Sequence, residues 1–340
     1  MQYVRENREV IEGADLLLKR CGNLKKGEAL TIVCDPQTRE AADLLARRAK
    51  LITSSVTMLE IPTFKMHGEE PNEQAANAML KSDLCMGITS KSMAHTRARQ
   101  MASQKGCRYL SLPEYSMDLF ADPSLRVDYE KRSVLARYVA DVFTQGNEVK
   151  VTSVSGTNIR MSIAGRVGNC CPGYVRGPGE LGSPPDIEAN VSPIENSAEG
   201  VVVVDGAIPY PGIGLLKEPV MLKVKGGHLV QMEGNRKIKE VLKRLFDDVS
   251  SEKAFILAEC GVGLNDRASL RGVMLTDEGA AGTMHFGFGS NSTVGGVNEV
   301  SFHLDFVFQK PTLKVDNKVV LEGGDLRLKE PEHGFRGGSR

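Results

Sequence analysis

The stretch ALTIVCDPQTREAADLLARRAK, residues 29–50, indicates how the first half of the chain folds. It begins with an apolar run, 29–34, that is rich in β-branched side chains, as buried strands are, and Asp35-Pro36 ends this run. From Thr38 to Lys50 the apolar residues recur at helical spacing. A strand followed at once by a helix is the repeating unit of a parallel α/β sheet.

The same alternation continues to about residue 145. Further strands are expected at 55–61, 84–88 and 108–112, and further helices at 72–82, 93–105 and 132–143. We therefore predict that residues 1–146 form an N-terminal α/β domain with a parallel sheet. The last of these helices would lead out of the domain, because Gln145-Gly146-Asn147 is a break in the pattern.

Short strands separated by glycines dominate the second half. We expect strands at 148–154, 158–163, 200–205 and 220–224, and one clear helix at 235–248. The glycine- and proline-rich segment 173–185 is expected to be an extended loop that borders a cleft. Residues 147–340 are therefore predicted to form a mostly β, α+β domain, and the residues discussed below make it the metal-binding, catalytic domain.

Charge and composition exclude several classes of partner. The 340 residues carry 43 Lys and Arg against 43 Asp and Glu, and a net charge of +0 argues against a nucleic-acid groove or a polybasic membrane surface. No apolar run is long enough to span a membrane, and Met1 to Glu6 lacks the apolar core of a secretory signal. The seven cysteines are odd in number and form no Cys-x-x-Cys pair, which favours reduced thiols. We expect a cytoplasmic protein without a nucleic-acid or membrane partner.

Residues that bind metals gather in the last third of the chain. His303 and Asp305 stand two apart in a predicted strand, so their side chains project from one face and offer half of a divalent-metal site. His285 lies in the apolar, glycine-rich run MHFGFG. Glu259 follows the apolar strand 255–258, where a carboxylate needs a hydrogen bond or a cation. Two histidines and these carboxylates on β segments predict a mixed nitrogen and oxygen metal site.

Other acids compete for a place in this site. Glu195 precedes the strand that begins near residue 200, and either it or Glu199 could reach over the same sheet. Asp277 and Glu278 lie in a polar turn and are expected to be solvated or to support the ligands, while Glu299 fits either role.

The remaining candidates for chemistry have little local support. Four histidines have no carboxylate or histidine at ligand spacing and are expected to be structural or exposed: His67, His95, His228 and His333. There is no Gly-x-Ser-x-Gly elbow, and Cys260 has only generic neighbours, so the pattern does not favour a serine or cysteine nucleophile.

At these residues the chain resembles the aminopeptidase T and aminopeptidase S family of dinuclear metallopeptidases, which includes thermophilic metalloproteases and leucyl aminopeptidases. The resemblance covers the order of the two halves and is most specific from Glu195 to Asp305. It implies a homodimer, and it implies two divalent ions of Zn, Co, Mn or Mg in each site. The ligands that it implies are Glu195, or Glu199 in its place, with Glu259, His285, His303 and Asp305.

The main functional prediction is therefore a metal-dependent, aminopeptidase-like hydrolase of amide bonds, with a peptide or a small molecule as substrate. A water that bridges the two ions would be the nucleophile at neutral pH. Either of the predicted catalytic residues, Glu195 or Glu259, would act as its general base.

The chain also resembles 2,5-dihydroxypyridine 5,6-dioxygenase, through the segment 197–200, a Gly-Gly pair and the His-x-Asp motif. This resemblance implies a mononuclear non-heme Fe(II) enzyme that cleaves the ring of a dihydroxypyridine-like aromatic. In that family a histidine stands at the position of Glu259 and an apolar residue at that of His285, which favours the hydrolase. In the alternative, His285, His303 and Asp305 would form a two-histidine, one-carboxylate iron face. A metal-free binding protein of the same fold is a third alternative.

Overall fold

The apolar runs of the first half form a parallel sheet. The computed structural model describes residues 8–328, and in it β1 (Leu30–Cys34) pairs in parallel with β2 (Val56–Glu60) and with β3 (Leu84–Ile88). β4 (Arg108–Ser111) continues the sheet, whose strand order is β2-β1-β3-β4-β8. Every residue of β1, β3 and β4 is buried, as expected of strands that are covered on both faces.

Helices cover the two faces of this sheet, because alternate strand residues point in opposite directions. Ile32 belongs to a core that includes residues of α1 (Arg8–Leu16) and α2 (Arg39–Ala49). Val33 belongs to a second core that includes residues of α3 (Glu73–Met79) and α4 (Arg97–Gln104). The other helical segments of the first half are Leu17–Cys21, α5 (Met117–Ala121) and Pro123–Arg126.

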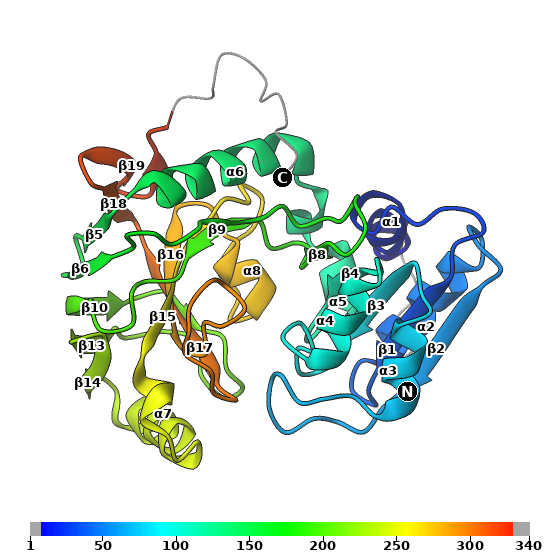
Figure 1. Ribbon diagram of the computed structural model, residues 1–340, viewed down its shortest axis with the longest axis horizontal. Helices are drawn as coiled ribbons and strands as arrows, with labels where there is room; N and C mark the ends of the chain where they lie inside the picture. Colours follow the sequence, from blue (N-terminus) through cyan, green and yellow to red (C-terminus); the bar gives the residue numbers. More distant parts are fainter. Residues whose placement is uncertain (1–7, 329–340) are drawn as a thin grey trace.

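The second half of the chain builds two antiparallel sheets (Figure 1). One is eight-stranded, in the order β14-β13-β10-β6-β5-β18-β19-β20, and the other is seven-stranded, in the order β12-β11-β17-β16-β15-β9-β7. The strands of the eight-stranded sheet are β5 (Glu148–Ser153), β6 (Asn158–Ser162), β10 (Glu199–Val204), β13 (Val220–Lys225), β14 (His228–Glu233), β18 (Pro311–Val315), β19 (Lys318–Glu322) and β20 (Asp325–Leu326). The strands of the seven-stranded sheet are β7 (Asn169–Cys171), β9 (Glu188–Val191), β11 (Ala207–Ile208), β12 (Gly214–Leu215), β15 (Leu257–Gly263), β16 (Thr283–Gly289) and β17 (His303–Gln309). The predicted combination of a parallel α/β unit and a β-rich unit is thus confirmed.

Few helices accompany the two antiparallel sheets. α6 (Tyr129–Gln145), which the sequence places at the end of the first domain, packs against β7 and β9 and so covers the seven-stranded sheet (Figure 1). The others are α7 (Arg236–Asp248), a 3-10 turn at Glu252–Phe255 and α8 (Met274–Glu278). Among residues 8–328, no helix has both the length and the apolar character that crossing a membrane requires.

An aromatic core holds the seven-stranded sheet on one face. Phe286 stacks on Phe308 with ring centroids 5.2 Å apart, and Phe288 meets Phe306 edge to face at 5.5 Å. All four rings are fully buried, and such pairs add about 0.5–1.5 kcal/mol each beyond the area that they bury. Because side chains alternate along a strand, His285 and Asp305, which directly precede Phe286 and Phe306, project from the opposite face.

One short strand of the second half returns to the first sheet. β8 (Leu181–Gly182) lies within the segment that the sequence indicates as an extended loop, and it pairs in parallel with β4, where Tyr109 N donates a hydrogen bond to Glu180 O at 2.8 Å. The division into 1–146 and 147–340 stays a prediction. α6, which precedes this boundary, packs on the second half, and β8, which follows it, pairs with the first sheet.

Candidate metal centre and adjoining cavity

Four neighbouring strands of the seven-stranded sheet bring histidines and carboxylates to one face. Across β15, β16 and β17, Glu259 pairs with Gly287 and Gly287 with Asp305. Two residues further along β15, Gly261 pairs with His285 of β16. Two residues from Gly287 in the opposite direction along β16, Gly289 pairs with His303 of β17. Cross-strand partners share a face, and so do residues two apart, so the chemistry-bearing side chains all project away from the phenylalanine core.

Glycines in these rows leave the space that the polar side chains occupy. A Cβ on Gly261 would lie 2.0 Å from Nε2 of His285. A Cβ on Gly287 would lie 2.5 Å from Nε2 of His303 and 2.8 Å from Oδ1 of Asp305. Real Cβ atoms do not approach other atoms this closely, so glycine at these two positions is required by the side chains opposite them.

The first group of candidate ligands is Glu259, His303 and Asp305, whose ligand atoms all lie within 4.8 Å of one another. Nε2 of His303 is 3.4 Å from Oε2 of Glu259 and 3.3 Å from Oδ2 of Asp305. The His303 side chain is 24% exposed, whereas those of Glu259 and Asp305 are each 9% exposed. This group therefore opens toward solvent on the side of His303.

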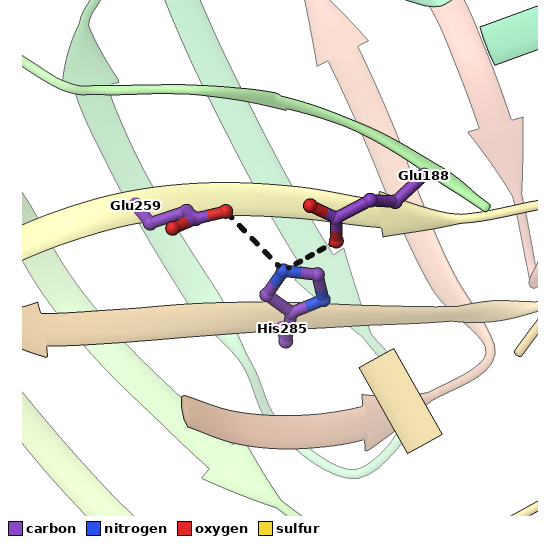
Figure 2. A group of neighbouring side chains, drawn as sticks. All are labelled: Glu188, Glu259 and His285. Atoms are coloured by element: carbon purple, nitrogen blue, oxygen red, sulfur yellow. Dashed lines mark ion pairs between the residues drawn. The ribbon is translucent and has the colours of Figure 1, made fainter. Parts of the chain in front are cut away.

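The second group is Glu188, Glu259 and His285 (Figure 2). Nε2 of His285 lies 3.0 Å from Oε2 of Glu188 and 3.7 Å from Oε1 of Glu259. All three side chains are buried, and His285 is only 1% exposed. Glu259 belongs to both groups and presents one oxygen to each.

Hydrogen bonding orients His303 as a ligand. Its Nδ1 lies 2.9 Å from the carbonyl oxygen of Ser290. A carbonyl only accepts, so Nδ1 carries the proton, and in the neutral ring Nε2 keeps a lone pair that faces Glu259 and Asp305. Metal-binding histidines are commonly fixed in this way by a carbonyl behind the ring.

Burial and mutual attraction shift the pKa values of this cluster. Burial disfavours charge on His285, but Glu188 and Glu259 outweigh it, so the pKa of His285 is raised well above its ordinary value. Burial likewise opposes charge on His303, and Asp305 and Glu259 raise its pKa well above that value. Burial raises and the two histidines lower the pKa of Glu259, and the net effect is a strong lowering. The carboxylates thus attract positive charge strongly.

The donor set fits a divalent metal ion. It combines imidazole nitrogens with carboxylate oxygens, which suits iron, manganese or zinc. Oδ1 of Asp305 is buried without a hydrogen-bond partner among the described residues, and a Cβ on Gly287 would lie close to both this oxygen and Nε2 of His303. Buried polar atoms are normally satisfied, so an unpaired carboxylate oxygen beside His303 is consistent with a cation as its missing partner.

Two cavities adjoin these ligands and share some of their lining residues. The outer cavity, of about 540 Å³, is bordered by α4 and by the loop from Ser290 to Phe302, and the inner cavity, of about 310 Å³, reaches His285 and Glu188. Glu259 and His303 line both. The inner cavity is also bordered by residues that follow the carboxyl ends of β3 and β4, where open parallel sheets bind their ligands.

The predicted ligands are brought together in part. Glu259, His285, His303 and Asp305 share the polar face, but Glu195 belongs to neither group. Its Oε1 accepts hydrogen bonds from Asn291 Nδ2 at 3.0 Å and from Val297 N at 2.8 Å, and its Oε2 pairs with Arg166 at 2.5 Å. These contacts hold the loop at the mouth of the outer cavity.

The other acids that compete for the site also lie apart from it. Glu199 is exposed, and its Oε1 accepts a hydrogen bond from Gly226 N at 2.7 Å. Glu299 is exposed and borders the outer cavity. Asp277 is fully buried and accepts hydrogen bonds from the backbone N–H groups of Arg271 and Gly272, so the expectation that it is solvated is wrong and its role is to hold that loop.

Sequence reasoning missed Glu188, which replaces Glu195 beside His285. Glu188 is the first residue of β9, three residues beyond the segment 173–185 interpreted as a loop. A signal was present: from Asp186 to Val191 polar and apolar residues alternate, as they do in a strand with one polar face. The shortness of this run, directly after Pro184-Pro185, concealed it.

Two further acids border the inner cavity. Asp186 and Glu278 each have a buried carboxylate oxygen without a hydrogen-bond partner among the described residues. Burial, and then Glu188, raises the pKa of Asp186 well above its ordinary value. Burial, and then Asp305, does the same for Glu278. Glu278 is therefore not a solvated turn residue.

The remaining histidines and Cys260 divide between the cavity and the core. His67 and His95 line both cavities, although their spacing gave no sign of this. Nδ1 of His228 lies 2.9 Å from Gly226 O, and His333 lies outside the described residues. Cys260 is buried, and burial raises its pKa to about 12, so it is not a thiolate nucleophile at neutral pH.

Comparisons with known proteins point to one family. A model of the family described as NicX, 2,5-dihydroxypyridine 5,6-dioxygenase, matches residues 10–328. The 2,5-dihydroxypyridine 5,6-dioxygenase of Pseudomonas putida is 24% identical over 316 residues, which is 86% of this chain and 87% of that protein.

Solved structures share the fold. The structure of 2,5-dihydroxypyridine dioxygenase from Pseudomonas putida superposes with a TM-score of 0.78 at 21% identity, covering 95% of this chain and 97% of that one. AmpT from Thermus thermophilus gives a TM-score of 0.72 at 15% identity, covering 95% of this chain and all of that one (100%).

These findings correct the functional prediction. The aminopeptidase resemblance holds only for the fold, whereas the family and the curated relative are those of a dioxygenase. The prediction of an aminopeptidase-like metallohydrolase that cleaves amide bonds is therefore wrong, and the dioxygenase alternative is better supported. Glu259 and His285 fit a dinuclear hydrolase locally, whereas the family match extends over residues 10–328.

Proposed function

The chain belongs to the family of 2,5-dihydroxypyridine 5,6-dioxygenases, and on that premise we propose that it is an iron-dependent oxygenase that opens the ring of a dihydroxypyridine or a related hydroxylated heteroaromatic. The observation that carries the proposal is the place of the Glu259, His303 and Asp305 group, where both cavities meet. Cavities of this size suit a small molecule.

We propose one ferrous ion, held by Glu259, His303 and Asp305. His303 is the histidine whose Nδ1 is tied to a carbonyl, and this group is the one that opens toward the cavity. When bound, a ferrous ion would supply the open coordination positions at which a ring hydroxyl and O₂ meet. The set has one imidazole and two carboxylates, so it differs by Glu259 from the two-histidine pattern, and its two negative charges would balance a dication.

The second group would support the first. His285 lies against Glu188 and beside Oε1 of Glu259, so the charged pair fixes the carboxylate that reaches the ion. This arrangement keeps Oε2 of Glu259 directed at His303. The aminopeptidase resemblance implies a further ion in the second group. Metal analysis distinguishes two ions per chain from the single ferrous ion proposed here.

Cavity residues would orient the ring and exclude water. Burial, and then Lys91, lowers the pKa of His67 to about 3, so its imidazole is neutral at pH 7. Nδ1 of His67 accepts a hydrogen bond from Ser92 N at 3.2 Å, which leaves the proton on Nε2. His67 can therefore donate this N–H to a ring oxygen or nitrogen of the substrate.

Metal content and oxygen consumption test the proposal. We expect about one equivalent of iron in protein reconstituted without air, and O₂ uptake when 2,5-dihydroxypyridine is added. His303→Ala should lose the iron and the uptake, while His228→Ala, a histidine outside the site, keeps both. Two equivalents of another divalent ion without O₂ uptake would overturn the proposal. A homodimer and a cytoplasmic location remain predictions that the oligomeric state and cell fractionation would test.

A further inference from the structure

Arg99 is the one lysine or arginine among the described residues that line the inner cavity. It lies in the first turn of α4, and its backbone N–H donates to the side chain of Thr96, the residue that caps this helix, at 3.2 Å. The helix follows β3, so Arg99 enters the cavity from the wall that the parallel sheet contributes. The metal centre enters from the seven-stranded sheet.

Most of the hydrogen-bonding capacity of Arg99 is not used within the protein. Its Nε donates to the carbonyl oxygen of Ala94. In the part of the chain that the structure describes, neither terminal nitrogen of its guanidinium has a hydrogen-bond or ion-pair partner. A guanidinium carries five N–H donors in one plane, so the donors on the two terminal nitrogens remain available to a ligand.

Among residues 8–328, this half-buried cation has no carboxylate at ion-pair distance. Burial lowers the pKa of Arg99, and Tyr109 offsets this only in part, yet an arginine stays charged at neutral pH. Five carboxylates line the same cavity, at Asp186, Glu188, Glu259, Glu278 and Asp305, and none is within 4.0 Å of the guanidinium. The cavity thus has an acidic, metal-binding wall and a separate cationic position.

We propose that Arg99 binds a carboxylate carried on the ring of the substrate, so that the substrate is a hydroxylated pyridine carboxylic acid rather than a ring that bears hydroxyls alone. This inference rests on the proposed function, in which the hydroxyls face the metal ligands. A carboxylate matches the paired donors of a guanidinium in plane and in spacing. An inner cavity of about 310 Å³ is at the small end of ligand sites, which fits a single substituted ring.

Binding of ring probes that are not turned over tests this assignment directly. We would titrate the protein calorimetrically with 6-hydroxypyridine-3-carboxylate and with 2-hydroxypyridine, which differ in the carboxylate. The wild-type protein should bind the carboxylate at least tenfold more tightly. Arg99→Gln should remove that difference, and Arg99→Lys, which keeps the charge but not the planar fork, should retain part of it. Lys105→Gln removes a charge from the exposed C-terminal end of α4, the helix that carries Arg99, and should behave as wild type.

Turnover then separates this inference from the proposed function. In Arg99→Gln, kcat/KM for a dihydroxypyridine carboxylate should fall at least tenfold more than kcat/KM for 2,5-dihydroxypyridine, which carries no carboxylate for the guanidinium to bind. An equal loss for both probes, or no loss for either, would overturn the role of Arg99 while leaving the dioxygenase proposal in place. Carboxylate binding that depends on Arg99 without O₂ uptake on any diol would overturn the proposed function alone. If Arg99→Gln does not fold, the comparison with Arg99→Lys decides.

Discussion

Gly261 and His285 face each other across β15 and β16, and a methyl group on Gly261 would lie 2.0 Å from Nε2 of the imidazole. The strand neighbour therefore sets where this histidine can stand. The ring occupies the volume that any other residue at 261 would fill, so the candidate metal centre depends on a residue that has no side chain of its own.

Gly261→Ala is expected to disturb the centre without touching a ligand. The added methyl must displace His285, and overpacking of this kind costs about 1–3 kcal/mol of the free energy of unfolding. We expect a lower melting temperature and loss of most O₂ uptake. The matched control is Gly177→Ala, whose methyl would have the flexible Glu180 side chain as its nearest neighbour among the described residues. Normal activity in Gly261→Ala would show that the position of His285 does not matter to the reaction.

Glu259→Gln and Glu195→Gln should have opposite effects on metal content. Glu259 lies between both histidines, so removal of its charge should abolish iron binding, measured by elemental analysis. Glu195 holds Arg166 and the loop that contains Asn291 and Val297, so Glu195→Gln should keep the iron and raise KM, with about 1.5–3 kcal/mol lost from the free energy of unfolding. Loss of iron in Glu195→Gln would instead support its role as a ligand.

Stability of the metal-free protein should fall as the pH rises. The pKa values of His285 and His303 are raised well above their ordinary value of 6.5, so the folded chain binds protons more tightly than the unfolded chain. The resulting stabilisation is complete below about pH 6.5 and is lost as the pH rises through the raised pKa values. Urea unfolding with a chelator, at several pH values above 6.5, measures this. Replacement of both histidines by glutamine should flatten the slope in this range, and an unchanged slope would contradict the assignment.

Local patterns were sufficient to predict most of the fold. The runs at 29–34, 84–88 and 108–112 became β1, β3 and β4 with shifts of at most one residue at either end, because a continuous apolar run between turn residues has few other uses. The helix at 235–248 began and ended within one residue of its predicted bounds, since Asn235 caps it. Two-residue strands such as β8 and β12 give no such pattern.

The site was predictable where its residues are neighbours in sequence and not where they meet through the sheet. His303 and Asp305 share a face because they stand two apart in one strand. Glu188 reaches His285 only because β15 pairs with both β9 and β16, and no local pattern shows that pairing. Glu195 looked equivalent in sequence, but Arg166, distant along the chain, pairs with its carboxylate. The role of Arg99 was hidden for the same reason, because the cavity wall exists only once the two halves are assembled.

The pairing of Leu181–Gly182 with β4 limits how this protein can be dissected. A fragment that stops near residue 146 would expose an unpaired edge of its sheet, and open edges promote association between chains. In the complementary fragment, Leu181–Gly182, which borders the inner cavity, would have lost its partner strand β4. We expect that neither fragment folds on its own. A chimera that combines the parallel sheet of one relative with the β-rich half of another should fold only if residues 173–185 come from the same protein as the parallel sheet.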